Sequence, residues 1–336
     1  MKKYLMITGS FPPDICGVGD YTAQFMNVAN PNTWHLYKSS EWGIRKIFGI
    51  ISAINKFKAN RLVMQYPTQG YGWSLVPQII CLYYSFFSSK KFIVVLHEFS
   101  QRSFKAKLAS IPLLLANHVI LTTELERIYV RKIMYRKYSV IHILSNIVSS
   151  KSKQTWGNRK FDMAYFGHIR PNKGLEDFFK VARDLCKLDK NINICIIGQL
   201  LPEFESYFDT LLSVYKLNIE IILNKPNDVV SDLLGNSKLT FLPFPDGISE
   251  RRGSFLAAIL NGSLVVSYNG RFVTKDLKKV YVATNLQNAV KDISVLLKET
   301  TNEQILEYQN KCNYYLQNIL PSSWDKVVSL YENEID

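Results

Sequence analysis

Residues 241–268, FLPFPDGISERRGSFLAAILNGSLVVSY, indicate the fold class of this 336-residue chain. An apolar run, Leu239–Pro243, predicts a strand, and the polar loop after it holds Arg251–Arg252. A short apolar helix is expected next, ending at Asn261–Gly262, before a second strand at Leu264–Ser267. The order strand, loop, helix, strand is typical of a parallel α/β unit. Because helix N-termini offer free N–H groups and a positive dipole end, we expect the double-arginine loop to bind an anion such as a phosphate.

Strand and helix patterns alternate along the rest of the chain, which predicts an α/β fold of parallel βαβ units. Strands are expected at Tyr4–Thr8, Arg61–Gln65, Phe92–Leu96, His118–Thr122, Val140–Leu144, Phe161–Phe166, Ile192–Ile197, Ile219–Leu223 and Leu239–Leu242. Helices are expected at Asp20–Val28, Leu175–Leu188, Glu203–Tyr215, Val229–Leu234, Glu303–Leu316 and Ser323–Glu332. Two Rossmann-like doubly wound domains are the simplest architecture for this order, and the cleft between them is the expected ligand site.

The polar segment 149–160, SSKSKQTWGNRK, has no periodicity and is interpreted as an interdomain linker. It divides the chain into an N-terminal domain, residues 1–150, and a C-terminal domain, residues 151–316, with a final helix in 317–336. A length of 336 residues is sufficient for two domains, each with its own core.

The composition is that of a soluble globular protein, with 47% apolar and 21% charged residues. No apolar run reaches the roughly 20 residues needed to span a bilayer; the longest is Ile79–Phe87. The apolar part of the N-terminus is too short for a signal peptide. The five cysteines show neither paired nor metal-type spacing, so we expect reduced thiols in a cytosolic protein.

The net charge of +13 is concentrated in the first half of the chain. Residues 1–150 contain 18 Lys and Arg against 6 Asp and Glu, whereas residues 151–336 contain 23 against 22. The charge favours an anionic partner and leaves open a membrane surface, a phosphorylated lipid, a nucleic acid or solubility alone. Interleaved aromatic residues favour a peripheral membrane patch, although an ordinary amphipathic helix explains part of the pattern. These aromatic residues are Tyr83, Tyr84, Phe86, Phe87 and Phe104.

A glycine-containing loop at residues 11–22 follows the first predicted strand. Gly17 and Gly19 either allow backbone to approach a substrate closely or form a structural turn. Thr22 stands where a dinucleotide fingerprint requires a third glycine, so NAD binding is not expected.

A second loop, GHIRPNKG at 167–174, places Arg170 and Lys173 ahead of a helix. It lacks the residue order of a P-loop, and a solvated basic loop is the alternative. Loops at the carboxyl ends of parallel strands lie on one sheet edge, so these two cations are expected to converge with Arg251–Arg252 on a diphosphate.

His97 ends a predicted strand, where it either contacts a substrate or is a buried structural residue. The other four histidines show no metal-ligand spacing. No Ser-His-Asp arrangement is apparent, so the residues predict neither a metal site nor a protein nucleophile.

Five segments, in this order, together resemble glycosyltransferase family 4, a family of retaining enzymes with the GT-B fold. They are FPPDICGVGDYT (11–22), LHEF (96–99), YFGHIRPNKGLEDFFKVA (165–182), LLGNSKLTFLPFPDGISERRGSFLAAILNGSLVVS (233–267) and SSWDKVVSLYE (322–332). The resemblance covers nearly the whole chain and implies two Rossmann-like domains, with the final helix crossing back onto the first.

By matching position, the resemblance implies catalytic roles for His97, near the donor sugar, and for Arg251. Lys173, with Arg170 or His168, would hold the donor diphosphate. The full set of implied donor-binding residues is Gly17, Gly19, Arg170, Lys173, Ser249, Arg252, Gly253 and Ser254.

The sequence departs from the family pattern at two paired glutamates, which fall on Ser249 and Ala257. Ala257 cannot hydrogen-bond a ribose, as the second glutamate is expected to do. Glu250 is one position away from the first glutamate, so that role is not transferred to it. The arginine-rich version resembles a subgroup of bacterial polysaccharide enzymes.

The resemblance implies a retaining glycosyltransferase that moves a sugar from a UDP- or GDP-linked donor to a lipid-linked saccharide acceptor. The implied setting is bacterial surface polysaccharide assembly, such as the O-antigen of lipopolysaccharide. It implies no metal, no further cofactor and no nucleic-acid partner. The enzyme would be cytoplasmic and peripheral, on the anionic inner face of the cell membrane.

Three other functions stay open from the residues. The missing glutamate pair favours a non-catalytic subunit that binds a nucleotide sugar. The positive charge favours a nucleic-acid-binding protein, although no recognised motif accompanies it. A sugar epimerase on the same fold requires an acid–base pair that the sequence does not reveal.

Overall fold

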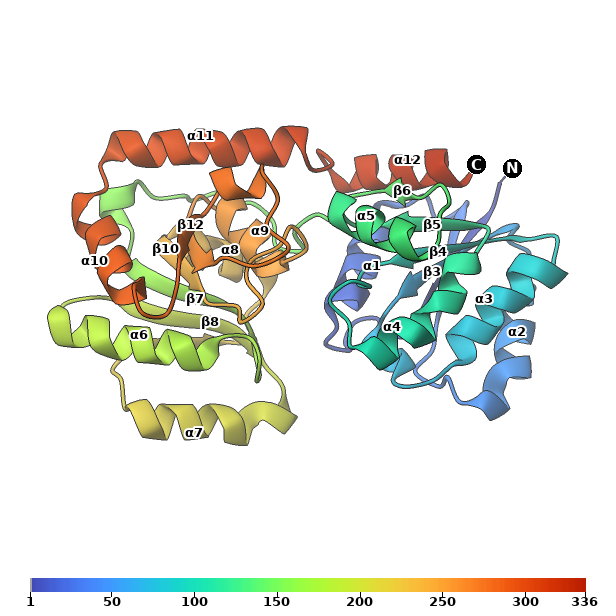
Figure 1. The fold of residues 1–336 in the computed structure, drawn as a ribbon, viewed down its shortest axis with the longest axis horizontal. Helices are drawn as coiled ribbons and strands as arrows, with labels where there is room; N and C mark the ends of the chain where they lie inside the picture. The colour runs from blue at the N-terminus through green and yellow to red at the C-terminus, as the bar shows by residue number, and fades with distance from the viewer. Residues whose placement is uncertain (1) are drawn as a thin grey trace. The chain divides into compact units, whose positions relative to one another are not determined.

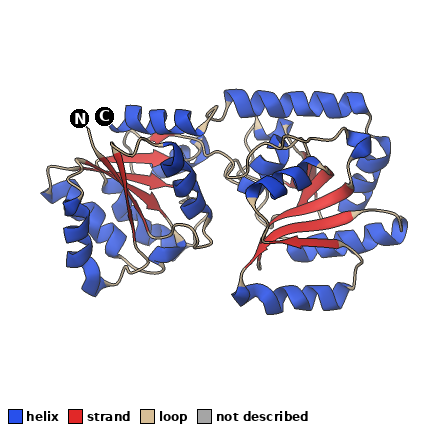
Figure 2. Cartoon of the chain, turned by 180° about the vertical axis from the view of Figure 1, so that it is seen from behind, coloured by secondary structure: helices blue, strands red, loops and turns tan. Residues whose placement is uncertain are grey.

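The computed structural model describes residues 2–336, which form two α/β units (Figure 1). The first unit comprises the chain through Leu144 together with Pro321–Asp336, and the second comprises Ser145–Leu320. Each unit is built on a six-stranded sheet with helices packed against it (Figure 2). All neighbouring strands in both sheets run parallel. The predicted fold class, two Rossmann-like α/β domains, is therefore confirmed.

The first sheet has the strand order β2-β1-β3-β4-β5-β6. The strands are β1 (Tyr4–Thr8), β2 (Trp34–Lys38), β3 (Arg61–Tyr66), β4 (Lys91–Leu96), β5 (His118–Leu121) and β6 (Ser139–Val140). The chain places β2 on one side of β1 and β3 on the other, so the direction of winding reverses beside β1. In parallel α/β sheets, ligands bind outside the carboxyl ends of the strands at such a switch point.

Helices cover both faces of the first sheet, which explains why its central strands are mostly apolar. Alternate residues of β1 enter different cores: Leu5 and Ile7 enter one, and Tyr4 and Met6 enter the other. The first core is closed by α2 (Ile47–Lys56), α3 (Val76–Phe87) and α5 (Glu124–Ile133). The second is closed by α1 (Gly17–Val28) and α12 (Trp324–Ile335).

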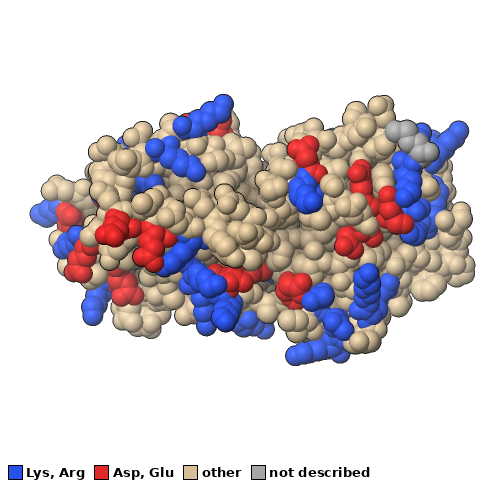
Figure 3. All heavy atoms as spheres, turned by 90° about the horizontal axis from the view of Figure 1, so that it is seen from above, with Lys and Arg blue, Asp and Glu red and all other residues tan. Residues whose placement is uncertain are grey.

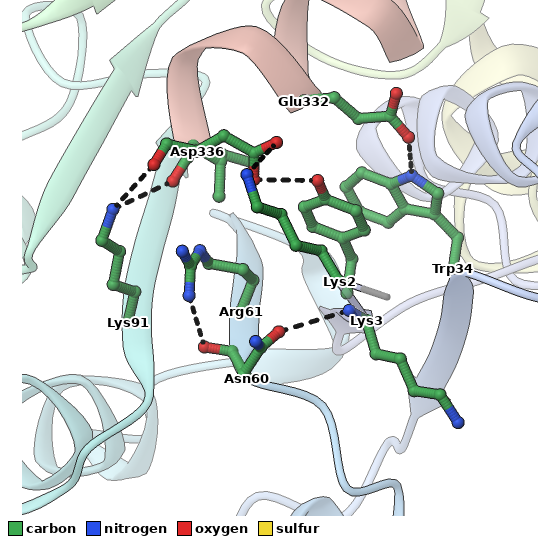
Figure 4. A network of polar contacts seen from close by, with 10 residues as sticks. Lys2, Lys3, Trp34, Asn60, Arg61, Lys91, Glu332 and Asp336 are labelled. Carbon is green, nitrogen blue, oxygen red and sulfur yellow. Dashed lines mark hydrogen bonds and ion pairs between the residues drawn. The ribbon is translucent and has the colours of Figure 1, made fainter.

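The C-terminal helix α12 is held onto the first unit by polar contacts at its end (Figure 4). Trp34 Nε1 donates to Glu332 Oε1 at 2.9 Å, and Lys91 Nζ donates to the Asp336 carbonyl at 3.3 Å. Lys2 pairs with the Asp336 carboxylate at 2.9 Å. Tyr331 is buried beneath the helix, and its hydroxyl lies 3.2 Å from the hydroxyl of Tyr21.

Removing the Tyr331 side chain should leave a large cavity under α12. We expect Tyr331→Ala to lower the free energy of unfolding of the first unit by about 3–5 kcal/mol, as for other large aromatic side chains. Urea unfolding followed by tryptophan fluorescence reports this, since four of the five tryptophans lie in the first unit. The exposed Tyr314 of the second unit is the control, and Tyr314→Ala should change stability by less than about 0.5 kcal/mol. Equal effects of the two substitutions would contradict this packing.

The second sheet has the strand order β12-β11-β10-β7-β8-β9. Numbered from its first strand, this is the order 3-2-1-4-5-6 of a dinucleotide-binding fold, with the switch point between β7 and β10. The strands are β7 (Phe161–Ile169), β8 (Ile194–Leu200), β9 (Glu220–Leu223), β10 (Ser237–Leu242), β11 (Leu264–Tyr268) and β12 (Val282–Thr284).

One face of the second sheet packs against four helices: α6 (Leu175–Leu188), α7 (Glu205–Tyr215), α10 (Ala289–Glu299) and α11 (Asn302–Asn318). The other face packs against α8 (Asn227–Gly235) and α9 (Gly253–Leu260). Within residues 2–336, no helix is both long and apolar enough to cross a membrane.

Two sequence-based interpretations are wrong in detail. The strand expected at Val140–Leu144 is reduced to the two residues of β6, and residues 141–144 run without regular structure. The segment 149–160 is not an open linker, because it packs onto the second unit. Arg159 is buried there and donates to the carbonyls of Ser237 at 2.9 Å and Gly262 at 2.8 Å.

Candidate functional site

The loops after β7 and β10 meet at the switch point of the second sheet. Because β7 and β10 are neighbours, both loops leave the same edge. Gly174 has a φ of 82°, and a Cβ placed on it would lie 2.0 Å from the carbonyl oxygen of Pro243. Only glycine allows this approach, so the two loops touch backbone to backbone.

The loop after β7 presents Arg170 and Lys173 just before the N-terminus of α6. The buried hydroxyl of Tyr165 donates to the carbonyls of Lys173 at 3.2 Å and His168 at 3.4 Å, which fixes the loop. Burial, and then the positive charges of Lys173 and Arg170, lowers the pKa of His168 to about 4. His168 is therefore neutral at neutral pH and leaves the positive charge of this loop to its two neighbours.

The loop after β10 carries Arg252 at the N-terminus of α9. Its guanidinium lies over the ring of Phe244, 4.3 Å from the centroid, and pairs with the Asp246 carboxylate. Gly253 and Ser254 form the first turn of α9, where backbone N–H groups have no partner in the helix. A Cβ on Gly167, at the end of β7, would lie 3.8 Å from Ser254 Oγ, so this turn also adjoins the other loop.

Electrostatics confirms that the two loops share one neighbourhood. Burial raises the pKa of Tyr165, and the charge of Glu176 adds to this rise. The positive charges of Arg252 and Arg170, one from each loop, both act against it. The structure thus brings Arg170, Lys173, Arg252, Gly253 and Ser254 together, beside the N-termini of two helices. This arrangement suits a di-anion such as a diphosphate.

The remaining residues of the arginine loop differ in exposure. Arg251 is half-buried beside Arg252, whereas Ser249 is 3% exposed. The Ser249 hydroxyl has no hydrogen-bond partner within residues 2–336. Glu250 is buried and accepts a hydrogen bond from Thr274 Oγ1 at 2.7 Å. Ala257 belongs to the apolar cluster beneath α8 and α9, so it offers no polar contact to a ligand.

The other predicted site residues, Gly17, Gly19 and His97, lie in the first unit. A Cβ on Gly19 would be 3.1 Å from the carbonyl oxygen of Ser10, so this glycine is needed for a close approach, whereas one on Gly17 would meet nothing within 4 Å. His97 follows β4 and is only 6% exposed. Its Nε2 donates to Gln65 Oε1 at 2.6 Å, and its ring packs edge-on against Tyr21 with 5.2 Å between centroids.

One titratable residue of the glycine loop was missed by the sequence analysis. Asp20, in the first turn of α1 directly after Gly19, has its pKa raised by burial to about 6. Its carboxylate makes no hydrogen bond or ion pair with another residue of the range 2–336. A carboxyl that titrates near neutral pH at a switch point is a candidate proton acceptor. Only its position after two glycines signals this in the sequence.

Replacing Asp20 should change stability in a pH-dependent way. The folded-state pKa of about 6 exceeds the ordinary value of 3.8, so the carboxyl favours folding below about pH 4 relative to higher pH. This contribution is lost as pH rises toward 6. We therefore expect Asp20→Asn to raise the melting temperature at pH 7 and to have a smaller effect at pH 4. Thermal melts at both values test it, with exposed Asp209→Asn as the control. A gain that is independent of pH would contradict the buried ionisation.

Within residues 2–336, no three His, Cys, Asp or Glu side chains are grouped as metal ligands. The five cysteines are all free thiols.

Two Rossmann-like sheets in one chain, with a cationic loop pair at the second switch point, define the class of protein: the GT-B fold. Residues 149–315 match the family model described as "Glycosyl transferases group 1". The matched residues all lie within the second unit. No curated protein gives a significant match to the sequence.

Solved structures similar to this chain have the same fold. Anabaena HepE, in complex with UDP and glucose, has 12% identity and a TM-score of 0.74, covering 99% of this chain and 100% of HepE. A putative UDP-N-acetylglucosamine 2-epimerase from Listeria monocytogenes has 12% identity and a TM-score of 0.63, covering 95% and 96%.

A mutant of S. aureus TarM, in a complex that includes UDP, has 16% identity and a TM-score of 0.62 over 86% of this chain. The chain spans 58% of the length of that protein.

Proposed function

We propose that the chain is a retaining glycosyltransferase of the family 4 type, which transfers a sugar from a nucleotide sugar to an acceptor hydroxyl. The observation that carries this proposal is the placement of Arg170, Lys173, Arg251 and Arg252 on adjoining loops of a group 1 domain, beside the N-termini of α6 and α9. UDP is present in the HepE and TarM complexes, which favours a uridine nucleotide.

The chemistry follows from the charge on the leaving group. As the glycosidic bond breaks, the diphosphate gains negative charge, and fixed cations that meet this charge lower the barrier by several kcal/mol. They would supply the charge stabilisation for which other enzymes use a divalent metal. Resemblance to family 4 suggests attack from the leaving-group face, with a donor phosphate oxygen taking the acceptor proton. The anomeric configuration is then retained without a protein nucleophile.

The four cations should dominate nucleotide affinity. A ligand at about 100 times its Kd stabilises the folded state by roughly 2.7 kcal/mol, so UDP should raise the melting temperature. Loss of one charged hydrogen bond costs about 1.5–3 kcal/mol, so Lys173→Ala and Arg251→Ala should weaken UDP binding about 10–100-fold. Lys187→Ala, at the far end of α6, is the matched control and should bind UDP normally.

Arg251→Ala should also lose most turnover while folding normally. Near-full transfer of sugar by this variant would contradict the role assigned to Arg251.

A non-catalytic, nucleotide-binding subunit is the second candidate, favoured by the apolar surroundings of Ala257. Binding of UDP without hydrolysis or transfer of any nucleotide sugar would identify it. An epimerase, favoured by the similar Listeria fold, would instead convert UDP-N-acetylglucosamine to its 2-epimer without an acceptor.

We further propose that the first unit docks on an anionic membrane on the cytoplasmic side, where a lipid-linked acceptor for surface polysaccharide is found. Residues 41–137 contain 15 Lys and Arg against 4 Asp and Glu. The helices of this segment also expose large apolar side chains: Phe48, Tyr83, Phe86, Phe87, Phe104, Leu108, Ile128 and Tyr129. On the face drawn in Figure 3, by contrast, acidic and basic side chains intermingle on both units. Exposed apolar groups set among cations suit an anionic bilayer surface.

Liposome flotation should separate the contribution of positive charge from that of the exposed apolar side chains. We expect the protein to float with vesicles containing phosphatidylglycerol more than with pure phosphatidylcholine vesicles, and less as salt is raised. The pair Phe86→Ser and Phe87→Ser should reduce flotation because it removes two exposed rings from the end of α3. The pair Leu188→Ser and Val214→Ser, equally exposed on the second unit, is the matched control. Equal, salt-insensitive partition onto both vesicle types would rule out the anionic surface.

A further inference from the structure

A cavity of about 610 Å³ lies within the first unit, between the loops that follow β2 and β3. One wall consists of Ser40 and the Trp42–Ile44 turn, and another of residues between Gln69 and Ser74. The floor is the start of α3, with Leu75, Val76 and Ile79. This volume falls in the range of about 300–1,000 Å³ typical of small-molecule sites.

The walls of this pocket are joined by hydrogen bonds and adjoin the switch point of the first sheet. Gly70 N donates to Ser10 Oγ at 2.7 Å, and a Cβ on Gly70 would lie 1.7 Å from the carbonyl oxygen of Gly9. The pocket is thus built against the loop that leads to Gly17 and Gly19. A hydrogen bond also joins the two walls, because Ser74 Oγ donates to the Trp42 carbonyl. The site is therefore largely formed before a ligand binds.

The chemistry of the lining selects an uncharged ligand. No Lys, Arg, Asp, Glu or His side chain lines the pocket. One part offers a serine hydroxyl and the backbone groups of a glycine-rich turn, which suit sugar hydroxyls. The other part is aliphatic, formed by Ile44, Leu75, Val76 and Ile79.

The rim of the pocket is apolar and open to solvent. Ile44 and Leu75, which line the pocket, are 63% and 57% exposed, and Trp73, between the lining residues Gly72 and Ser74, is 86% exposed. Phe48, on the first turn of α2, is also exposed. Large apolar side chains exposed together mark contact with another apolar phase, and tryptophan favours the boundary between that phase and water.

We propose that this pocket binds a glycolipid acceptor, with its hydrocarbon chain against the aliphatic part and an uncharged sugar against the serine and glycine part. The chain enters from the bilayer across the rim of Ile44, Trp73 and Leu75. This inference rests on the proposed transferase function and names its acceptor class. The positive charge of residues 41–137 supplies attraction to the membrane, so the pocket itself needs no charge.

The test uses n-octyl-β-D-glucoside, below the concentration at which it forms micelles, as the probe. Gly43 lies in ordinary extended backbone, and a Cβ on it meets nothing within 4 Å, so Gly43→Phe should fill the pocket without strain. Gly157, in the second unit, is equally open, so Gly157→Phe is the matched control. By calorimetry, the full chain should bind one octyl glucoside, Gly43→Phe at least tenfold more weakly, and Gly157→Phe normally. Ile79→Gln, a change at a half-exposed position in the floor of the pocket, should also weaken binding of octyl glucoside.

The inference is overturned if Gly43→Phe binds octyl glucoside as the native chain does, or if glucose alone binds as tightly as octyl glucoside. Urea unfolding followed by tryptophan fluorescence checks that the first unit of Gly43→Phe is folded, since four of the five tryptophans lie in that unit. UDP binding, measured on the same samples, keeps the two proposals separate. UDP binding without octyl glucoside binding removes the acceptor pocket and leaves the transferase. Octyl glucoside binding blocked by Gly43→Phe, in a chain that does not bind UDP, supports the pocket and removes the transferase.

Discussion

The contact between Gly174 and the Pro243 carbonyl is the constraint on which the site of the second unit depends. It is possible only with a left-handed backbone and no side chain at Gly174. Through this contact, two loops that lie about 70 residues apart in sequence present their cations to one region. Like charges at close range repel one another, and the Asp246 carboxylate that pairs with Arg252 offsets part of this repulsion. The lowered pKa of His168 limits the repulsion further, since a third charged group beside Lys173 and Arg170 is avoided.

Under the proposed function, the absence of carboxylates at positions 249 and 257 would change how the site holds a nucleotide. A glutamate at either position would repel the diphosphate while it bonded the ribose, whereas Ser249 and Ala257 carry no charge. Recognition of the nucleotide would then depend less on directed ribose contacts and more on charge pairing with the arginines. The Ser249 hydroxyl, buried and without a partner in the described chain, is the group best suited to a remaining polar contact.

Local sequence patterns predicted the helices and strands whose apolar faces are defined by residues close together in the sequence. The Leu175–Leu188 helix has the predicted bounds because its apolar spacing and the glycine before it act within one turn. Strand β2 was missed because, at a sheet edge, its residues are only partly buried and give no apolar run. Residues 141–144 are as apolar as a strand, but Ile141, Ile143 and Leu144 pack into the core that α12 closes. Pairing with β5 ends at Ile141, whose N–H donates to the Leu121 carbonyl at 2.9 Å. The partners of Arg159 lie 78 and 103 residues away, and the burial of Asp20 depends on the tertiary fold, so neither can be seen in a local pattern.

The two halves of the chain use charge over different ranges. Residues 151–336 are nearly neutral in total, so their arginines act through contact at the switch point rather than through a long-range field. Residues 1–150 carry the excess positive charge, yet the pocket in the first unit has no charged lining. Charge spread over helices attracts an anionic surface across about 8–10 Å of salt solution, whereas an uncharged pocket discriminates by shape and by apolar contact. Under the proposed function, a sugar passes from a soluble anionic donor to a membrane-bound acceptor, which calls for both uses of charge. Confining each use to its own unit would keep the diphosphate from competing for the acceptor pocket.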